Sequence, residues 1–308
     1  MSKNLATLIG LTAILQWSSI VGLLKNISAQ IGADLAVTCM YSFATIILLF
    51  IFKFPRLSQI PRAYLISAAL LFLVYELCFS YAIALAQNAQ QAIEISLVNY
   101  LWPSLTVAML ILFKQLAFNR WVIVGLCISF SGVIYIQTGN GGLSLDSMLQ
   151  HISTNPISYF LAFLGALLWS LYCVVTRKYS EGHNPISFFF LVISVVLWVK
   201  MLWLHPIAVL PHFSVSLIMQ MLAVSLVTGL GYAAWNIGMN HGNITMLVTL
   251  SYFSPIFSSL ISMWILGVDL SMSFWHGAIL VTSGSFICWL STNWQELKTR
   301  FKRLKTNG

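Results

Sequence analysis

Long apolar runs alternate with short polar segments along the whole chain. Each run approaches the roughly 20 residues that a helix needs to cross a bilayer. The strict apolar–polar alternation that marks the strands of a membrane β-barrel is absent from the sequence. Because the backbone polar groups of a segment in lipid must be paired within that segment, the runs predict ten transmembrane helices. They cover residues 5–24, 35–52, 63–85, 91–113, 120–137, 156–178, 185–204, 216–239, 243–265 and 273–291.

The second half of the chain repeats the first half at an offset of 152 residues. Each copy contains five of the expected helices, and an odd number of helices places two copies in opposite orientations across the membrane. The pattern predicts an all-α polytopic membrane protein with two inverted five-helix repeats, which is typical of alternating-access transporters. The identical residues are Trp17 and Trp169, Ser18 and Ser170, Tyr100 and Tyr252, Pro103 and Pro255, Gly125 and Gly277, Ser131 and Ser283, and Gly132 and Gly284.

The repeat also gives the expected domain organisation. Residues 1–138 form the first repeat, residues 139–155 an extracytoplasmic linker, residues 156–292 the second repeat and residues 293–308 a basic cytoplasmic tail. Small residues in spans five and ten let helices approach closely, so these spans pack against each other or against a second copy. We therefore expect a monomer or a weak homo-oligomer. The small residues are Gly125, Ser129, Gly132, Gly277 and Gly284.

Composition and charge agree with a membrane protein. Apolar residues make up 59% of the chain and charged residues 7%, against about 25% charged residues in a soluble domain. With ten spans numbered in order, 13 of the 15 Lys and Arg residues fall on the side that holds both termini, and only Lys25 and Lys200 fall on the other. The positive-inside rule therefore predicts cytoplasmic termini. The net charge of +8 reflects this topology and does not indicate a nucleic-acid partner.

Two carboxyl groups lie inside the expected spans. Glu76 is deep within span three, where it shares a helix face with Ser80, and Glu94 lies a turn inside the extracytoplasmic end of span four. An ionisable group in the hydrocarbon is costly and usually faces a cavity or a partner. Either residue could bind a substrate ammonium or carry a proton, or could be a hydrogen-bonded structural residue between helices.

Pro103 and Pro255 occupy equivalent positions near the middle of spans four and nine. A proline cannot donate to the carbonyl four residues earlier, which frees the carbonyls of Asn99 and Ser251. Freed carbonyls at membrane depth are tolerated where neighbours or a wet cavity satisfy them. Two helix kinks at matching positions therefore indicate a central site.

Several tryptophans lie deeper than the interfacial belt, where Trp and Tyr usually act as anchors. Trp169 and Trp235 each share a helix face with other aromatic or polar side chains, including Asn236 beside Trp235. Each ring alone could serve ordinary helix packing. Together with Trp17 and Trp102 they predict a pocket with aromatic walls, suited to planar apolar groups or to cations held over ring faces.

The sequence also indicates what the site does not bind. No Lys or Arg lies well inside a span, so a phosphate or a carboxylate-rich substrate has no charged partner. A single carboxylate could be held by a helix end or by donors such as Asn99 and Asn236. The sequence contains no catalytic or phosphate-loop motif and no Cys or His spacing for a metal. We therefore expect neither an enzyme nor a bound cofactor or metal.

Four motifs resemble a known family. Ala6–Leu11 (ATLIGL), Val98–Ser104 (VNYLWPS), Tyr159–Phe163 (YFLAF) and Tyr232–Asn236 (YAAWN) are similar to the YddG-type aromatic amino-acid exporters, within the EamA-like drug/metabolite transporter superfamily. The resemblance runs from about residue 5 to residue 291. It implies a multi-pass protein of the bacterial inner membrane that exports Phe, Tyr and Trp, with wider tolerance for amino acids and toxic cations. It places Tyr100, Trp102 and Trp169 at the substrate, beside Tyr75, Glu76 and Asn99.

The sequence thus predicts a transporter that moves amino acids through a midplane cavity between the repeats. The alternative is a proton-coupled multidrug or toxic-cation exporter, in which Glu76 or Glu94 titrates. Positions where the repeats differ, such as Trp102 against Ser254 and Glu76 against Thr228, are expected to select the substrate. The expected partners are the substrate and membrane lipid. The expected site residues are Trp17, Tyr75, Glu76, Asn99, Tyr100, Trp102, Trp169, Asn236 and Tyr252, with helix kinks at Pro103 and Pro255.

Overall fold

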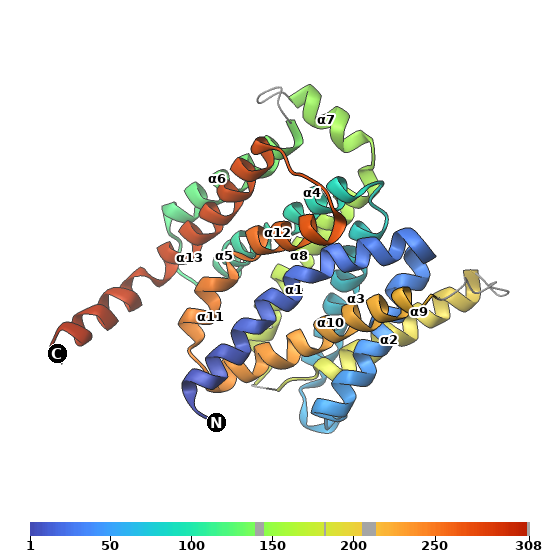
Figure 1. Cartoon of the computed structure of the whole chain (residues 1–308). Helices are drawn as coiled ribbons and strands as arrows, with labels where there is room; N and C mark the ends of the chain where they lie inside the picture. The colour runs from blue at the N-terminus through green and yellow to red at the C-terminus, as the bar shows by residue number, and fades with distance from the viewer. Residues whose placement is uncertain (139–144, 182, 205–213, 307–308) are drawn as a thin grey trace.

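The computed structural model describes residues 1–138, 145–181, 183–204 and 214–306 (Figure 1). Within these ranges all the regular secondary structure is α-helix or 3-10 helix and no strand occurs, which confirms the all-α prediction. The helices are α1 (Lys3–Ile31), α2 (Ala33–Phe52), η1 (Leu57–Gln59), α3 (Arg62–Ala84), α4 (Ala89–Asn99), α5 (Trp102–Leu112), α6 (Arg120–Thr138), α7 (Leu145–Ser153), α8 (Pro156–Tyr179), α9 (Ile186–Leu204), α10 (Val215–His241), α11 (Ile244–Ser251), α12 (Ser254–Leu266) and α13 (Met272–Thr306).

Eight segments of the described chain are long and apolar enough to cross a membrane. They correspond to α1, α2, α3, α4 with α5, α8, α9, most of α10 and the first part of α13. Two of the ten expected windows contain shorter apolar helices, Arg120–Ile136 and Ser254–Leu266. In the window 243–265 the apolar helix is short because the chain is not helical between Ser251 and Ser254. The protein is therefore a multi-pass membrane protein.

The helices pair between the two halves of the chain. α1 packs along α10, α3 along α8, α2 along α9 and α6 along α13 (Figure 1). Buried apolar side chains from α1, α2, α3, α8, α9 and α10 form the main core, with Phe72, Phe189 and Phe190 among its largest members. Large apolar side chains such as Phe50 and Trp264 are exposed on the outside, as expected of a surface that faces lipid.

The helix is broken at both of the expected proline kinks. α4 ends at Asn99 and α5 begins at Trp102, with Pro103 in its first turn. α11 ends at Ser251 and α12 begins at Ser254, with Pro255 in its first turn. Proline is well placed in a first helical turn because its missing N–H has no intrahelical partner there. Each kink predicted from the sequence is thus a separation into two helices.

Small residues bring α6 and α13 into backbone contact. A Cβ atom at Gly284 would lie 2.4 Å from the carbonyl oxygen of Gly125, and one at Gly132 would lie 2.7 Å from that of Gly277. Between these contacts Ser129 donates a hydrogen bond to the carbonyl of Val281 (3.3 Å). The helices expected as spans five and ten therefore pack against each other within one chain, as small residues at a helix interface allow.

The linker and the tail contain helical structure that the apolar pattern does not predict. The described part of the linker forms α7, which lies over one end of the molecule (Figure 1). Residues 139–144, the first part of the expected linker, lie outside the described residues. α13 continues through the expected basic tail to Thr306 and projects away from the helical body (Figure 1).

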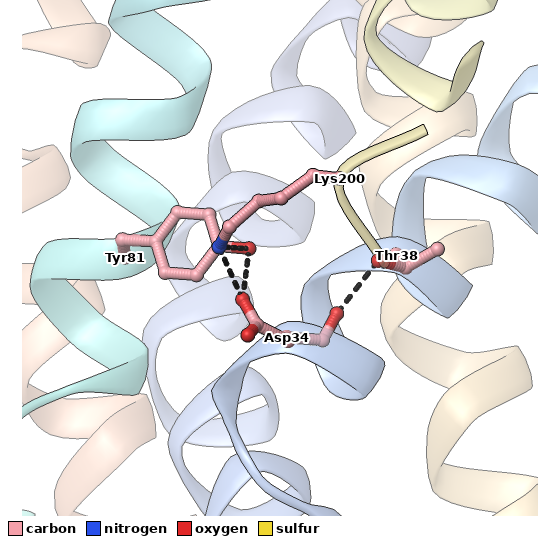
Figure 2. Close-up of polar contacts among 4 residues, drawn as sticks. All are labelled: Asp34, Thr38, Tyr81 and Lys200. Carbon is pink, nitrogen blue, oxygen red and sulfur yellow. Dashed lines mark hydrogen bonds and ion pairs between the residues drawn. The ribbon is translucent and has the colours of Figure 1, made fainter. Parts of the chain in front are cut away.

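An ion pair connects three helices at one end of the structure. Lys200, on α9, pairs with Asp34 in the first turn of α2 (Figure 2). The hydroxyl of Tyr81, on α3, donates to Asp34 (2.6 Å) and accepts from the Lys200 ammonium (2.8 Å). The same ammonium lies 4.1 Å from the centre of the Tyr81 ring. This cluster connects α2 and α3 of the first half to α9 of the second.

Breaking this cluster is expected to have a small effect on stability. The Lys200 and Asp34 side chains are 39% and 30% exposed, and partly exposed pairs contribute about 1 kcal/mol or less. Lys200→Met should therefore lower the melting temperature in detergent by only a few degrees. The charge-swapped double variant, Asp34→Lys with Lys200→Asp, should recover part of the loss. A larger loss in the double variant than in Lys200→Met would contradict this electrostatic account.

Candidate functional site

A cavity of about 140 Å³ lies in the middle of the helical body. Its walls come from both halves of the chain, namely α1 to α5 of the first half and α8, α10, α11 and α12 of the second. Apolar and aromatic side chains provide most of its surface, with a few polar groups among them. This composition is typical of a small-molecule site. The lining residues are Trp17, Ile20, Met40, Tyr41, Tyr75, Glu76, Phe79, Ser80, Asn99, Tyr100, Trp102, Trp169, Thr228, Tyr232, Trp235, Ser251 and Ser254.

Trp169 of α8 is the centre of one aromatic wall. Its ring centroid lies 4.7 Å from that of Tyr75 and 5.1 Å from that of Tyr172. Trp102 meets it edge-on, with centroids 6.1 Å apart and planes at 81°. Offset and edge-to-face contacts at these separations are attractive and hold the rings in place. The wall therefore presents ordered aromatic surfaces from α3, α5 and α8.

A second aromatic group lies where α1 meets α10. The ring centroids of Trp17 and Tyr232 are 5.2 Å apart, and those of Trp17 and Trp235 are 5.4 Å apart. Gly231 makes room for the indole, because a Cβ atom there would lie 2.7 Å from Trp17 Nε1. The absence of a side chain at one α10 position thus lets Trp17 pack across that helix.

Glu76 is the acidic residue among the cavity-lining residues. It is 5% exposed and accepts two hydrogen bonds, one on each carboxyl oxygen. The hydroxyl of Tyr41 donates to Oε2 (2.5 Å) and that of Tyr232 donates to Oε1 (2.6 Å). Tyr41 is also hydrogen-bonded to Ser80 (2.9 Å). The carboxyl group is therefore fixed by neighbours on α2 and α10, as buried polar groups require.

Hydrogen bonds connect the first helix break to α8. Near the first break, the Asn99 side chain donates to the carbonyl of Ala162 (3.1 Å). The carbonyl of Trp102 accepts from the Ser170 hydroxyl (3.1 Å). Polar groups at the break are thus hydrogen-bonded to α8. Such pairing is required inside a membrane, where no water is available to pair with them. The other break contributes Ser254, the first residue of α12, to the lining.

Most of the predicted site residues lie together in this cavity. Pro103 and Pro255 each directly follow a lining residue, Trp102 and Ser254 respectively. The predicted residues in the lining are Trp17, Tyr75, Glu76, Asn99, Tyr100, Trp102 and Trp169.

Two predicted residues, Tyr252 and Glu94, lie outside the described lining, and the structure does not describe the side chain of a third, Asn236. Tyr252 is not in the described lining; it is buried, and its ring centroid lies 6.1 Å from that of Trp289. Glu94 is buried outside the cavity and accepts a hydrogen bond from Gln90 (2.8 Å). The side chain of Asn236 lies outside the described residues.

The expected site residues omit Tyr41 and Tyr232, which the structure places in the lining together with Trp235, one of the tryptophans predicted for the aromatic walls. A signal for Tyr41 exists in the sequence, because Thr38, Tyr41 and Thr45 form a polar stripe at helical spacing on the otherwise apolar α2. Tyr232 shares one helix face with Trp235 and Asn236, and the prediction takes only those two residues from that face. The other lining residues outside the hypothesis are Ile20, Met40, Phe79, Ser80, Thr228, Ser251 and Ser254.

Known proteins provide the family assignment. The profile of the EamA-like transporter family matches residues 156–290. The chain is 42% identical to the aromatic amino acid exporter YddG of Escherichia coli (strain K12), and the alignment covers 95% of this chain and 99% of that protein. It is 40% identical to the aromatic amino acid exporter YddG of Salmonella typhimurium (strain 14028s / SGSC 2262), with the same coverage. A crystal structure at 21% identity shares the fold, with a TM-score of 0.65 over 94% of this chain and 98% of that chain. The chain therefore belongs to the EamA-like transporter family and groups with the YddG proteins.

Proposed function

We propose that this protein exports the aromatic amino acids Phe, Tyr and Trp, together with other amino acids, across the bacterial inner membrane. The observation that carries the proposal is a central cavity whose walls are aromatic and whose lining includes one buried carboxyl group, Glu76. An aromatic amino acid has a matching pair of features, a planar ring and an ammonium. Relatives at 42% and 40% identity named as aromatic amino acid exporters support the same substrate class.

The cavity would divide recognition between the ring and the head group. The indoles of Trp102 and Trp169 and the Tyr75 ring would pack on the substrate side chain. Glu76 would accept from the ammonium. The amide oxygen of Asn99 would also accept a hydrogen bond from the ammonium, since the amide nitrogen already donates one to the carbonyl of Ala162. The substrate carboxylate would face the N-terminal turn of α12, which begins at the lining residue Ser254 and where the positive end of the helix dipole favours an anion.

We further propose that the chain crosses the membrane ten times, as two inverted repeats with both termini in the cytoplasm. The order of the helices supports this, because α1 to α6 are followed by α8 to α13 in the same pattern, including a break at the same place. The pairing supports it too, because the offset of 152 residues exchanges the pair α1 and α10 with the pair α8 and α3. Residues 1–138 and 156–292 would be the repeats, 139–155 an external linker and 293–308 a cytoplasmic tail.

Transport would proceed by alternating access. Both halves of the chain supply lining residues, and transporters with inverted repeats bind substrate between the repeats and rock one against the other. Relative motion of the halves would expose the cavity to each side of the membrane in turn. The Tyr232–Glu76 hydrogen bond crosses between the halves and would take part in that motion.

The direct test is uptake of labelled Trp and Phe by proteoliposomes that contain the purified protein and are preloaded with unlabelled substrate. We expect saturable exchange of both amino acids, well above the rate in protein-free liposomes. A sugar phosphate should neither enter nor compete, because the described lining contains no Lys or Arg. Trp and Phe rates equal to those of protein-free liposomes would overturn the proposed function.

A proton-coupled exporter of drugs or toxic cations is the second candidate, because Glu76 is a buried carboxyl group within reach of a ligand. If Glu76 binds the ammonium, Glu76→Gln should reduce Trp exchange at least about tenfold at every pH, as expected for a lost hydrogen bond to a charged group. If Glu76 instead carries a proton, the variant should keep exchange at equal pH and lose only uptake driven by a pH gradient. Glu94→Gln is a matched control outside the cavity and should transport like the wild type. Normal behaviour of Glu76→Gln in both assays would make Glu76 a structural residue.

A further inference from the structure

Two phenol groups contact the Glu76 carboxyl group, with one hydrogen bond on each of its oxygens. Tyr41 donates to Oε2 and Tyr232 donates to Oε1, at 2.5 and 2.6 Å. Tyr41, Glu76 and Tyr232 all line the cavity, and each comes from a different helix. The carboxyl group is thus held from two sides, and its orientation depends on where the two rings are fixed.

Packing fixes both rings. Phe190 of α9, which is fully buried, lies 5.5 Å from the Tyr41 ring centroid and 5.3 Å from that of Tyr232. Phe72 and Trp17 hold the Tyr232 ring from other directions, at 5.9 and 5.2 Å. Because these contacts restrict both rings, their hydroxyl groups are aimed at Glu76 before any ligand binds. A polar group held in advance in its binding geometry loses little freedom when the ligand arrives.

The two phenol hydrogen bonds leave acceptor positions on the Glu76 carboxylate that a cation could use. An ionised carboxylate offers about four acceptor positions, and an ammonium offers three donors. The two phenols occupy one position on each oxygen, so each oxygen retains another for a ligand N–H. A phenol donates one hydrogen bond and carries no charge, so it orients the carboxylate without neutralising it. The remaining positions favour a positively charged donor over a neutral one.

We propose that Tyr41 and Tyr232 are positioning residues that set the Glu76 carboxylate for a primary ammonium and thereby make the cavity select ligands that carry one. This inference rests on the proposed function and adds to it the group that determines specificity. Tyr41 comes from the same half of the chain as Glu76 and Tyr232 from the other half. The recognition point for the ammonium is therefore complete only when both halves are in contact there.

The test compares three ligands that share an indole ring. Tryptophan has both an ammonium and a carboxylate, tryptamine only the ammonium, and 3-indolepropionate only the carboxylate. Binding to the full-length protein in nanodiscs is measured for the wild type, Tyr41→Phe, Tyr232→Phe and Tyr159→Phe. Tyr159, on α8, is a matched control because it is a buried tyrosine outside the cavity lining. Thermal unfolding of each variant is recorded alongside.

Tyr41→Phe and Tyr232→Phe should each weaken the binding of tryptophan and tryptamine about tenfold, as loss of a hydrogen bond to a charged group implies. Affinity for 3-indolepropionate should change less than about twofold, because the aromatic walls are unchanged and the ligand has no ammonium. Tyr159→Phe should bind all three ligands like the wild type. In a Glu76→Gln background the tyrosine substitutions should have little further effect, since residues that act through one group are not additive.

Several outcomes would overturn this proposal. If the tyrosine substitutions weaken the binding of all three ligands equally, the tyrosines contribute to the aromatic wall and do not select for an ammonium. If the binding of tryptophan and tryptamine is unchanged, the tyrosines have no role in recognition. Tyrosine effects that persist in full in the Glu76→Gln background would show that they do not act through Glu76. Should one variant fail to fold, the other tests the same claim from a different helix. A wild type that binds tryptamine more tightly than 3-indolepropionate, loses that preference in the tyrosine variants, and yet transports no amino acid would refute the proposed function and leave this inference standing.

Discussion

Replacing Trp169 by alanine is expected to reduce exchange of tryptophan and phenylalanine by about tenfold or more. Trp169 is the shared neighbour in its wall, with contacts to Tyr75, Tyr172 and Trp102. Its removal takes away a stacking surface for the ligand and also the support that orders the remaining rings, and each aromatic contact is worth about 0.5–1.5 kcal/mol beyond its buried area. Proteoliposome exchange with labelled Trp and Phe measures the effect, and Trp102→Ala should behave in the same direction.

The control for this prediction is Trp264→Ala. Trp264 is also a tryptophan on a span, but it is 83% exposed on the outer surface of α12. The Trp264→Ala variant should transport normally. A normal rate would show that the loss in Trp169→Ala comes from the pocket and not from the removal of any bulky side chain in the membrane. If Trp102→Ala and Trp169→Ala both transport as well as the wild type, the aromatic cavity is not the substrate site.

The second large effect is expected from Gly284→Ala, which should sharply lower the yield and the melting temperature of the protein in detergent. The new Cβ atom would lie 2.4 Å from the carbonyl oxygen of Gly125 and 2.5 Å from the backbone nitrogen of Ser129. Both are backbone atoms, so α6 and α13 can relieve the overlap only by moving apart. Overpacking of this kind costs about 1–3 kcal/mol, and more where the backbone must move.

Gly229→Ala is the matched substitution for this experiment. It also adds one methyl group to a glycine inside a span, but its nearest neighbour, the carbonyl oxygen of Ala44, would be 3.3 Å away. We expect a small change in melting temperature there. Fluorescence-detected gel filtration after heating gives both values. A melting temperature of Gly284→Ala equal to that of Gly229→Ala would mean that α6 and α13 are less closely packed than described.

Features that depend on the local sequence are the ones that could be predicted. Pro103 and Pro255 interrupt the helix through the chemistry of the residue itself, so their positions can be read directly. The depth of Glu76 and of the tryptophans follows from their distance to the span ends, and the structure places Trp17, Trp102 and Trp169 in the lining of one cavity with Glu76. Glycines at helical spacing predict that α6 and α13 each pack closely against another helix, and the structure shows that they contact each other.

Features that depend on how helices rotate against one another could not be predicted in this way. Tyr41 reaches Glu76 only because α2 turns that face toward α3, and hydropathy does not fix this rotation. The prediction includes Tyr252, the repeat equivalent of Tyr100, among the site residues. The chain leaves regular α-helical geometry between Ser251 and Ser254. Helical spacing therefore cannot predict which residues on the two sides of this break share a helix face. Ser251 and Ser254 line the cavity in place of Tyr252.

The cavity contains five pairs of residues that are 152 positions apart: Trp17 with Trp169, Glu76 with Thr228, Ser80 with Tyr232, Asn99 with Ser251, and Trp102 with Ser254. If the halves were two identical chains, every substitution would appear twice around the cavity, and a carboxyl group at one position would bring a second one with it. Two buried carboxyl groups in one small space resist ionisation together. Joining the halves covalently frees each member of a pair to change alone. A single gene can thus place an acid, an indole or a phenol on one side only, which an assembly of identical subunits cannot do.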